Sequence, residues 1–445
     1  MVILGLGSNV GDRLSHLRKA RTAIQHIPGI LIKQTSPIYL SDALLPENAP
    51  PEWDMPHLNL AIRCETTLEP LALLKQLKHI EWTIGRKPEI RHWGPRILDI
   101  DILAWDDLTI QSELLTVPHA SLQDRPFALW PLADVAPLWI FPLAGPNQGK
   151  PAALIVEKWG SRFTGNAPLH TQQIYHRIDT PRLVGIVNVT PDSFSDGGTF
   201  LNPSHALQHM LHLANSGAEV LDIGAESTAP NAVALDIDTE WARLEPILAT
   251  IKAVQASCFV APKISVDTRH SLIAAKALNF GIDWINDVSG LDDPAMREIV
   301  AQSAADCVVM HHMSIPEQRG HVLPRDQDPV NLVYAWGEKR LDELEKQGIA
   351  RERMIFDPGI GFGKMAEQSL LLLKHAHIFT QLGTRILIGH SRKTFLSLLS
   401  GMPFAERDME TMAMTLYLAQ QSVDYIRVHN VEACARGLRV AQAME

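Results

Sequence analysis

Two aspartates in the segment ILDIDIL have the chemistry and the spacing to bind a magnesium ion. Asp99 and Asp101 stand two residues apart in a stretch that predicts a strand, so both carboxylates point to one face, about 7 Å apart. Such a pair can hold Mg2+ and leave its other positions to water and phosphate oxygens. Basic residues precede the pair, namely Arg86, Arg91, His92 and Arg96. Cations beside paired carboxylates suit phosphoryl transfer, because a polyphosphate must be neutralised from several sides.

A second group of polar residues follows short apolar runs in the C-terminal part of the chain. These residues are Asn188, Glu226, Thr228, Asp267, Asn286, His311, Asp357, Lys393, Arg427 and His429. The cations of SRK at 391–393 and RVH at 427–429 suit a diphosphate. Asn188 offers a neutral oxygen to a Mg2+ ion whose other ligands are diphosphate and water. The acids and amides suit the donor and acceptor edge of an aminopyrimidine ring.

Each of these residues also has a purely structural explanation. An isolated DxD pair is most often a solvated edge strand with salt bridges, and one polar strand end is more often a loop cap or an ion pair. Trp93 and Phe127, taken alone, are more often core aromatics than ligand contacts. The joint occurrence of polar residues at successive strand ends disfavours the structural explanation for the C-terminal group.

The elements that must position the C-terminal group repeat a short apolar strand followed by a helix-length stretch. The expected strands are LVGIVNV, EVLDIGA, KISVD, GIDWIND, DCVVMHH, MIFDPG, RILIGHS and VDYIRVH. Eight such units predict a (β/α)8 TIM barrel, in which the active site lies at the carboxyl ends of the strands.

The N-terminal part predicts a different fold. Apolar residues share one face of an expected helix after Asp12, namely Leu14, Leu17, Ala20, Ile24 and Ile27. The stretches 58–64 and 98–102 alternate apolar and polar residues, as half-buried strands do. The order of elements favours a ferredoxin-like α/β sandwich. We therefore expect an α/β protein with two domains, at residues 1–160 and 180–445, joined by a linker at 161–179.

Composition limits the class of protein. A chain of 445 residues exceeds the usual size of one core. Its net charge of -10 disfavours a nucleic-acid partner, and no apolar run is long enough to cross a membrane. The N-terminus does not look like a signal peptide. The four cysteines form no CxxC pair, which disfavours disulfides and thiolate zinc and predicts a cytoplasmic enzyme of small molecules.

Several N-terminal motifs together resemble one enzyme family. They are GSN at 7–9, LNLA at 58–61, RHWGPRILDIDIL from Arg91 and VPHASLQDRPF from Val117. Over residues 1–160 they resemble 6-hydroxymethyl-7,8-dihydropterin pyrophosphokinase. The resemblance implies that Asp99 and Asp101 bind two Mg2+ ions between ATP, the donor substrate, and the pterin. It implies ATP or transfer-group contacts for Arg86, Trp93, Arg96, His119 and Arg125, with Arg86 and Arg96 catalytic, and pterin contacts for Asn59 and Phe127.

The C-terminal motifs resemble a second family. NVTPDSFSDGG at 188–198, DPGIGFGK at 357–364 and SRK at 391–393 make residues 180–445 similar to dihydropteroate synthase. The resemblance implies that Asn188, Arg427 and His429 bind diphosphate and Mg2+. It implies that Asp267, Asn286, Asp357 and Lys393 bind the pterin, and that Thr228, Pro230 and Phe362 lie near p-aminobenzoate, with Lys393 and Arg427 catalytic. The implied reaction expels diphosphate, and the amine of p-aminobenzoate then attacks the pterin methylene.

Four positions depart from the two family patterns. His57, His92 and Ala120 replace a Tyr, an Arg and an aromatic residue in the first motifs, and Ala229 replaces the Arg of STRPG in the second. Ala229 predicts a looser loop over the barrel site.

Two alternatives to a fully bifunctional enzyme stay open at this point. In one, a domain has lost turnover and only binds pterin, and the barrel is the candidate because of Ala229. In the other, the barrel is related to pterin-binding methyltransferases, against which the SRK and NVTPDSFSDGG motifs argue. The resemblance also implies a possible homodimer through the barrel. The sequence does not decide whether the intermediate is channelled between the two sites.

Overall fold

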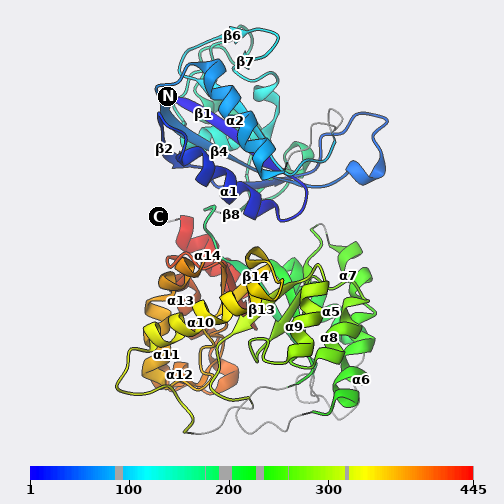
Figure 1. The fold of residues 1–445 in the computed structure, drawn as a ribbon. Coiled ribbons are helices and arrows are strands. Elements are labelled where there is room, and N and C mark those ends of the chain that lie inside the picture. Colours follow the sequence, from blue (N-terminus) through cyan, green and yellow to red (C-terminus); the bar gives the residue numbers. More distant parts are fainter. Residues whose placement is uncertain are drawn as a thin grey trace. The chain divides into compact units, whose positions relative to one another are not determined.

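The computed structural model describes residues 1–85, 94–175, 177–189, 203–226, 235–258, 260–315 and 320–443. The chain forms two compact units, Met1–Asp179 and Thr180–Glu445, both drawn in Figure 1. No helix in these ranges is both long and apolar enough to cross a membrane.

The first unit is built on an antiparallel sheet with helices packed against it. Its strands are β1 (Val2–Ser8), β2 (Ile30–Thr35), β3 (Ile38–Ser41), β4 (His57–Thr66), β5 (Asp99–Trp105) and β8 (Gln172–Tyr175), with β6 (Ile110–Gln111) and β7 (Thr116–Val117) in a separate hairpin. Its helices are α1 (Arg13–Gln25), α2 (Pro70–Ile84), α3 (Pro126–Val135) and α4 (Ala152–Val156), with short 3-10 turns η1 (Pro51–Trp53), η2 (Leu122–Asp124), η3 (Glu157–Trp159) and η4 (Pro168–His170). The strand order is β5-β1-β4-β3-β8, with β2 paired to β4.

Helix α1 illustrates how the sequence produces this unit. The Asp12 side chain caps the helix by accepting the backbone N–H of Ser15. The apolar residues spaced three and four apart are buried, as expected. On another part of the sheet, Tyr39 of β3 stacks on Trp130 of α3 within a separate buried cluster. The predicted α/β sandwich is therefore confirmed.

Residues 161–179, predicted to be a linker, instead belong to the first unit. Strand β8 pairs with the open edge of β3, and Arg162 forms an ion pair with Asp134. Arg162 Nη1 also donates to Tyr39 Oη at 2.9 Å, and Tyr39 Oη donates to Asp134 Oδ2 at 2.7 Å. The correction has a physical cause, because a four-residue polar strand gains its hydrogen bonds only from a distant partner strand.

The second unit is a closed parallel barrel, as predicted. Its strands are β9 (Arg182–Asn188), β10 (Ala218–Gly224), β11 (Lys263–Asp267), β12 (Trp284–Asp287), β13 (Asp306–Met310), β14 (Met354–Asp357), β15 (Arg385–Ile388) and β16 (Tyr425–Val428). Its helices are α5 (Pro203–Asn215), α6 (Ile237–Leu248), α7 (Ile251–Ser257), α8 (Ser271–Leu278), α9 (Pro294–Gln302), α10 (Pro329–Lys346), α11 (Ala366–Lys374), α12 (Thr394–Ser400), α13 (Asp408–Ala419) and α14 (Val431–Ala443), with turns η5 (Arg351–Arg353), η6 (Ala376–Leu382) and η7 (Phe404–Glu406).

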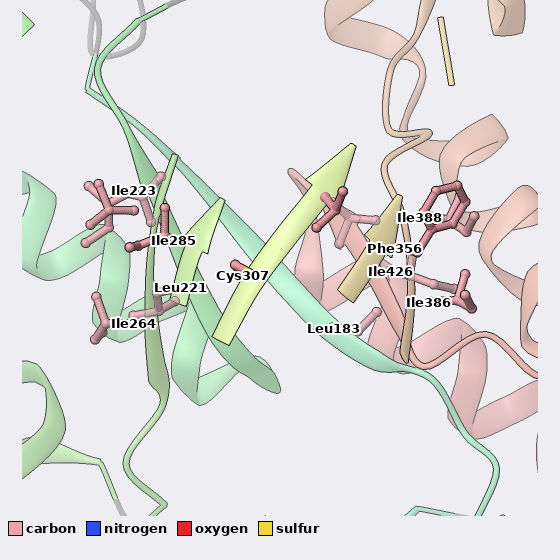
Figure 2. Packing of buried hydrophobic residues seen from close by; sticks show 14 of the residues in the cluster. Leu183, Leu221, Ile223, Ile264, Ile285, Cys307, Phe356, Ile386, Ile388 and Ile426 are labelled. Atoms are coloured by element: carbon pink, nitrogen blue, oxygen red, sulfur yellow. The ribbon is translucent and has the colours of Figure 1, made fainter. Parts of the chain in front are cut away.

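Alternate residues of the barrel strands belong to two separate cores. Figure 2 shows part of the first, where strand residues such as Leu221, Ile264 and Ile285 meet the surrounding helices. The second core fills the barrel and contains Val184, Val220, Trp284, Val308, Ile355, Leu387 and Tyr425. Polar residues occupy the next positions in the inward register: Asp222, Asp267, Asn286, Asp357 and Arg427. The strand period therefore brings these side chains together above an apolar floor.

Candidate active sites

The carboxylates of Asp99 and Asp101 lie among cations in the first unit. Strand β5 places both residues beside β1, where they pair with Gly7 and Gly5. Arg96 Nη1 donates to Asp99 Oδ2 at 2.7 Å. Lys78 Nζ lies 3.8 Å from one oxygen of each aspartate, and His119 Nε2 lies 3.9 Å from Asp101 Oδ2. Arg96 and His119 therefore both lie beside the acid pair.

The GSN segment fixes the approach to this pair. Asn9 Oδ1 accepts the backbone N–H of Arg96 at 2.7 Å, and the Asn9 N–H donates to the Arg96 carbonyl at 3.2 Å. Ser8 Oγ donates to the carbonyl of Ile97 at 2.6 Å. These bonds tie the end of β1 to the segment that carries Arg96.

The electrostatics of the pair suit a divalent cation. Partial burial and then the neighbouring charge of Asp99 raise the pKa of Asp101, whose side chain is 40% exposed. Two hard carboxylates close together match the oxygen preference of Mg2+. Among the described residues, no cluster of three or more His, Cys, Asp or Glu side chains could hold a metal alone. The pair therefore fits a magnesium site completed by phosphate and water oxygens.

The other predicted residues of the first site are partly placed. Asn59 of β4 lies opposite Gly7 and donates from Nδ2 to Ser41 Oγ at 3.1 Å. Phe127 stands in the first turn of α3 and Arg125 just before that helix. Burial lowers the pKa of Arg125, which the carboxylate of Asp101 opposes. Arg86 and Trp93 lie outside the described residues.

Two residues near the acid pair were missed by the sequence argument. Lys78 and Glu81 of α2 form an ion pair at 2.6 Å, and Glu81 is only 2% exposed. Their spacing of three residues looks like an ordinary solvated helix pair. Glu81 falls on the apolar face of the helix, and a glutamate in that position could have indicated a buried charge with a partner.

In the barrel, Arg427 binds two carboxylates from different strands. Its Nε donates to Asp222 Oδ2 at 2.6 Å and its Nη2 to Asp267 Oδ2 at 2.9 Å. Asn286 Nδ2 donates to the same Asp222 oxygen at 3.0 Å. Burial raises the pKa of Asp267, while Arg427 opposes the rise and Asp222 adds to it. Three predicted residues, Asp267, Asn286 and Arg427, thus form one network.

Asp222 completes this network and was not predicted. It lies within β10 rather than at its end, and it is 1% exposed. The signal was a charged residue inside the apolar run EVLDIGA, since a charge is rarely buried without a partner.

Asp357, Phe362 and Lys393 occupy another side of the barrel mouth. Asp357 Oδ1 accepts the Gly359 N–H at 2.7 Å, and burial raises the pKa of this carboxyl to about 6. Lys393 Nζ lies 4.1 Å from the centre of the Phe362 ring. This distance suits a cation–π contact. The DPGIGFGK and SRK segments therefore lie together at the barrel mouth.

The SRK and RVH segments also meet. Ser391 Oγ lies 2.9 Å from His429 Nδ1 and accepts the His429 backbone N–H at 3.2 Å. The Ser391 hydroxyl therefore contacts both the backbone and the ring of His429, which ties the two segments together. Burial and then the charges of Arg392 and Arg427 lower the pKa of His429 to about 3, so a neutral ring offers one N–H donor.

Asn188 ends β9 beside Gly224, at the same rim of the barrel. Thr228, Ala229 and Pro230 lie outside the described residues. The predicted contact of Thr228 with p-aminobenzoate and the effect of Ala229 therefore stay predictions.

The folds and sites define a two-domain enzyme, with a carboxylate pair among cations on a sandwich and an arginine among acid and amide groups at the mouth of a barrel. Comparisons with known proteins agree. Residues 3–137 match the family model of 7,8-dihydro-6-hydroxymethylpterin-pyrophosphokinase, and residues 184–429 match that of pterin binding enzymes. The chain belongs to the family of bifunctional folate synthesis proteins.

Full-length relatives support this membership. The folate synthesis bifunctional protein of Chlamydia caviae is 37% identical, over 99% of this chain and 97% of its own. A mitochondrial counterpart from Arabidopsis thaliana is 33% identical, over 100% of this chain and 83% of its own. Among solved structures, dihydropteroate synthase of Xanthomonas albilineans with 7,8-dihydropteroate is 36% identical, with a TM-score of 0.52, over 60% of this chain and 94% of its own. The methyltransferase alternative is therefore set aside.

Proposed function

We propose that this chain makes 7,8-dihydropteroate for folate biosynthesis in two consecutive reactions. The first transfers a pyrophosphoryl group from ATP to 6-hydroxymethyl-7,8-dihydropterin. The second joins the resulting pterin diphosphate to p-aminobenzoate and releases diphosphate. We assign the first reaction to residues 1–160, supported by the packed segment 161–179, and the second to residues 180–445.

In the first reaction the pterin hydroxyl displaces AMP from the β-phosphorus of ATP. Asp99 and Asp101 would hold Mg2+, which when bound neutralises phosphate charge during the transfer. Arg96 and His119, beside the two carboxylates, would meet the phosphates, together with Arg86, Trp93 and Arg125. Asn59 would match the pterin edge and Phe127 its ring face.

In the second reaction the carbon–oxygen bond to the diphosphate breaks and the p-aminobenzoate amine attacks the pterin methylene. Arg427, His429 and Asn188 would receive the leaving diphosphate, where a bound Mg2+ would add charge stabilisation. Asp267, Asn286 and Asp357 would bind the pterin. Lys393 would contact the ring system, and Phe362 with Thr228 would border p-aminobenzoate. No protein nucleophile is needed, because the leaving group carries the negative charge that the site stabilises.

One arrangement of side chains gives the strongest support for assigning the condensation to the barrel. Arg427 is held by two carboxylates, and Asn286 shares one of them, so a cation for diphosphate lies directly beside acid and amide groups for a pterin. A pterin diphosphate has both of these chemical ends.

The test is a product analysis with the full chain. Purified protein is given ATP, Mg2+, 6-hydroxymethyl-7,8-dihydropterin and p-aminobenzoate, and AMP, pterin diphosphate and dihydropteroate are separated by chromatography. We expect AMP and dihydropteroate in equal amounts. Pterin diphosphate that accumulates without dihydropteroate would instead reduce the barrel to a binding module.

Assembly and location belong to the same proposal. A homodimer through the barrel is supported by exposed apolar side chains on its C-terminal helices, including Leu398, Met409 and Val440. Light scattering would give twice the chain mass. A cytoplasmic location is supported by four free cysteines, three of them buried.

A further inference from the structure

Lys78 places a positive charge between the two carboxylates assigned to magnesium. Its Nζ lies 3.8 Å from Asp99 Oδ1 and 3.8 Å from Asp101 Oδ1. The side chain comes from helix α2, whereas both aspartates belong to strand β5. An ammonium equidistant from two carboxylates neutralises part of the charge that would attract a metal ion.

The ammonium is held in this place by groups other than the two aspartates. Lys78 Nζ donates to Glu81 Oε1 at 2.6 Å and to the Ile100 carbonyl at 2.9 Å. Glu81 Oε1 in turn accepts the Ile100 N–H at 2.7 Å. Ile100 stands between the two aspartates, so the cation is tied to the same stretch of backbone as the pair. Its position therefore does not depend on the aspartates alone.

The consequence for a divalent cation is electrostatic. A Mg2+ ion at the pair would lie a few ångströms from a fixed positive charge, so binding to the protein alone is opposed. A triphosphate brings several negative charges to the same place and offsets both Lys78 and the metal. The opposition is therefore largest before the nucleotide binds.

We propose that Lys78 is an internal counter-cation that makes magnesium binding at Asp99 and Asp101 depend on bound ATP. The proposal rests on the assignment of this pair as magnesium carboxylates. The ammonium offsets part of the charge of the two carboxylates until metal and nucleotide bind together.

The test measures metal binding rather than turnover. Mn2+, as a paramagnetic stand-in for Mg2+, is titrated into the full chain, and free Mn2+ is followed by electron paramagnetic resonance. Titrations are made without nucleotide and with α,β-methylene ATP, an analogue that cannot transfer its pyrophosphoryl group. The variants are Lys78→Met, which removes the charge, Lys78→Arg, which keeps it, and Lys75→Met, an exposed lysine on the same helix.

We expect Lys78→Met to tighten Mn2+ binding about tenfold without nucleotide. Repulsion from a unit positive charge near 4 Å weakens cation binding by about this factor at a partly solvated site. The dissociation constant of Mn2+ for Lys78→Arg and Lys75→Met should stay within about twofold of that of the unsubstituted chain. With the analogue bound, the difference in Mn2+ affinity between Lys78→Met and the unsubstituted chain should be smaller. Equal or weaker binding by Lys78→Met without nucleotide would overturn the proposal.

Two further variants keep the outcome interpretable. Lys78→Met leaves Glu81 buried without its cation, so Lys78→Met/Glu81→Gln repeats the test with Glu81→Gln as its reference. Only the lysine charge then differs between the two proteins, and the same tightening is expected. Asp99→Asn tests the underlying assignment separately. Undiminished Mn2+ binding by Asp99→Asn with the analogue would reject the metal site itself, whereas failure of Lys78→Met alone rejects only the counter-cation.

Discussion

Asp408 accepts two hydrogen bonds from the guanidinium of Arg392, from Nε at 2.8 Å and from Nη2 at 3.1 Å. Asn430 Nδ2 donates to the same carboxylate at 2.8 Å. Arg392 precedes Lys393, and Asn430 follows His429. One carboxylate at the start of α13 therefore ties together the two loops that present cations to the barrel site. Arg392 also has a φ of 55°, in the left-handed region that few non-glycine residues adopt.

Replacement of Asp408 should loosen both loops at once. For Asp408→Asn we expect the KM for pterin diphosphate to rise about tenfold and the free energy of unfolding to fall by about 1–3 kcal/mol, because a charged bidentate pair is lost. Steady-state kinetics and urea denaturation measure the two effects. Glu406→Gln, at a nearby exposed position, should change neither. An unchanged KM in Asp408→Asn would show that the contacts of Asp408 with Arg392 and Asn430 do not position Lys393 and His429.

Replacement of Asp222 should affect the condensation more strongly than replacement of Asp408, because Asp222 holds Arg427 at the barrel mouth. In Asp222→Asn the half-buried guanidinium keeps Asp267 but loses one of its two carboxylate partners. We expect kcat/KM of the condensation to fall roughly 10- to 100-fold, the equivalent of about 1.4–2.7 kcal/mol. Pyrophosphokinase activity of the same protein should stay unchanged. Asp238→Asn, an exposed substitution on α6, is the matched control, and an equal loss there would point to a nonspecific effect.

The contrast between Asp222 and Asp267 shows what the sequence could predict. Asp267 ends its strand, and a polar residue at a barrel strand end is a recognised place for chemistry. Asp222 lies two residues before the end of β10, where its pairing with Arg427, 205 residues away, and with Asn286 explains it. Partners this distant are set by barrel closure, which strand periodicity alone does not describe.

The same limit applies to the first unit. The strand carrying Asp99 and Asp101 was predictable from alternation, whereas β8 was not, because its pairing with β3 decides whether its residues form a strand. Lys78 and Glu81 gave a pattern shared with any solvated helix, and only packing against Ile100 distinguishes them.

The contacts of Lys364 indicate that it positions the loop that carries Phe362. Its buried Nζ donates to His311 Nδ1 at 2.8 Å, to the His311 carbonyl at 2.9 Å and to the Phe362 carbonyl at 3.0 Å. It therefore fixes the loop that carries Phe362 under Lys393. For Lys364→Met we expect the KM for p-aminobenzoate to rise about tenfold, with a smaller change in the KM for pterin diphosphate, since all three hydrogen bonds are lost.

The control for Lys364 is Lys374→Met, an exposed lysine at the end of α11. Lys364→Arg, which keeps the charge and the donors, should recover part of the affinity for p-aminobenzoate. Equal changes in both KM values would indicate a general loss of structure rather than a role for Lys364 in placing Phe362.

His390 predicts a pH dependence of stability. Burial lowers the pKa of this ring to about 4, and its Nε2 contacts the Thr411 carbonyl at 3.0 Å. In the unfolded chain the ring titrates near its ordinary pKa, so below about pH 6.5 the unfolded state binds the extra proton and stability falls until about pH 4. From pH 7.5 to 5 the contribution is about 2 kcal/mol.

His390→Gln keeps a donor near the Thr411 carbonyl but does not titrate. Urea denaturation should therefore show a smaller loss of stability between pH 7.5 and 5 in this variant than in the unsubstituted chain. Parallel pH profiles of the two proteins would contradict a neutral, buried His390.

The most direct test of two consecutive reactions uses one inactivated site at a time. Asp99→Ala and Arg427→Ala chains are each given ATP, Mg2+, 6-hydroxymethyl-7,8-dihydropterin and p-aminobenzoate, with and without added pterin diphosphate, and dihydropteroate is measured by chromatography. We predict that Asp99→Ala makes dihydropteroate only when pterin diphosphate is supplied, and that Arg427→Ala accumulates pterin diphosphate and AMP. Dihydropteroate formed by Asp99→Ala from the pterin alcohol, or formed normally by Arg427→Ala, would contradict the account.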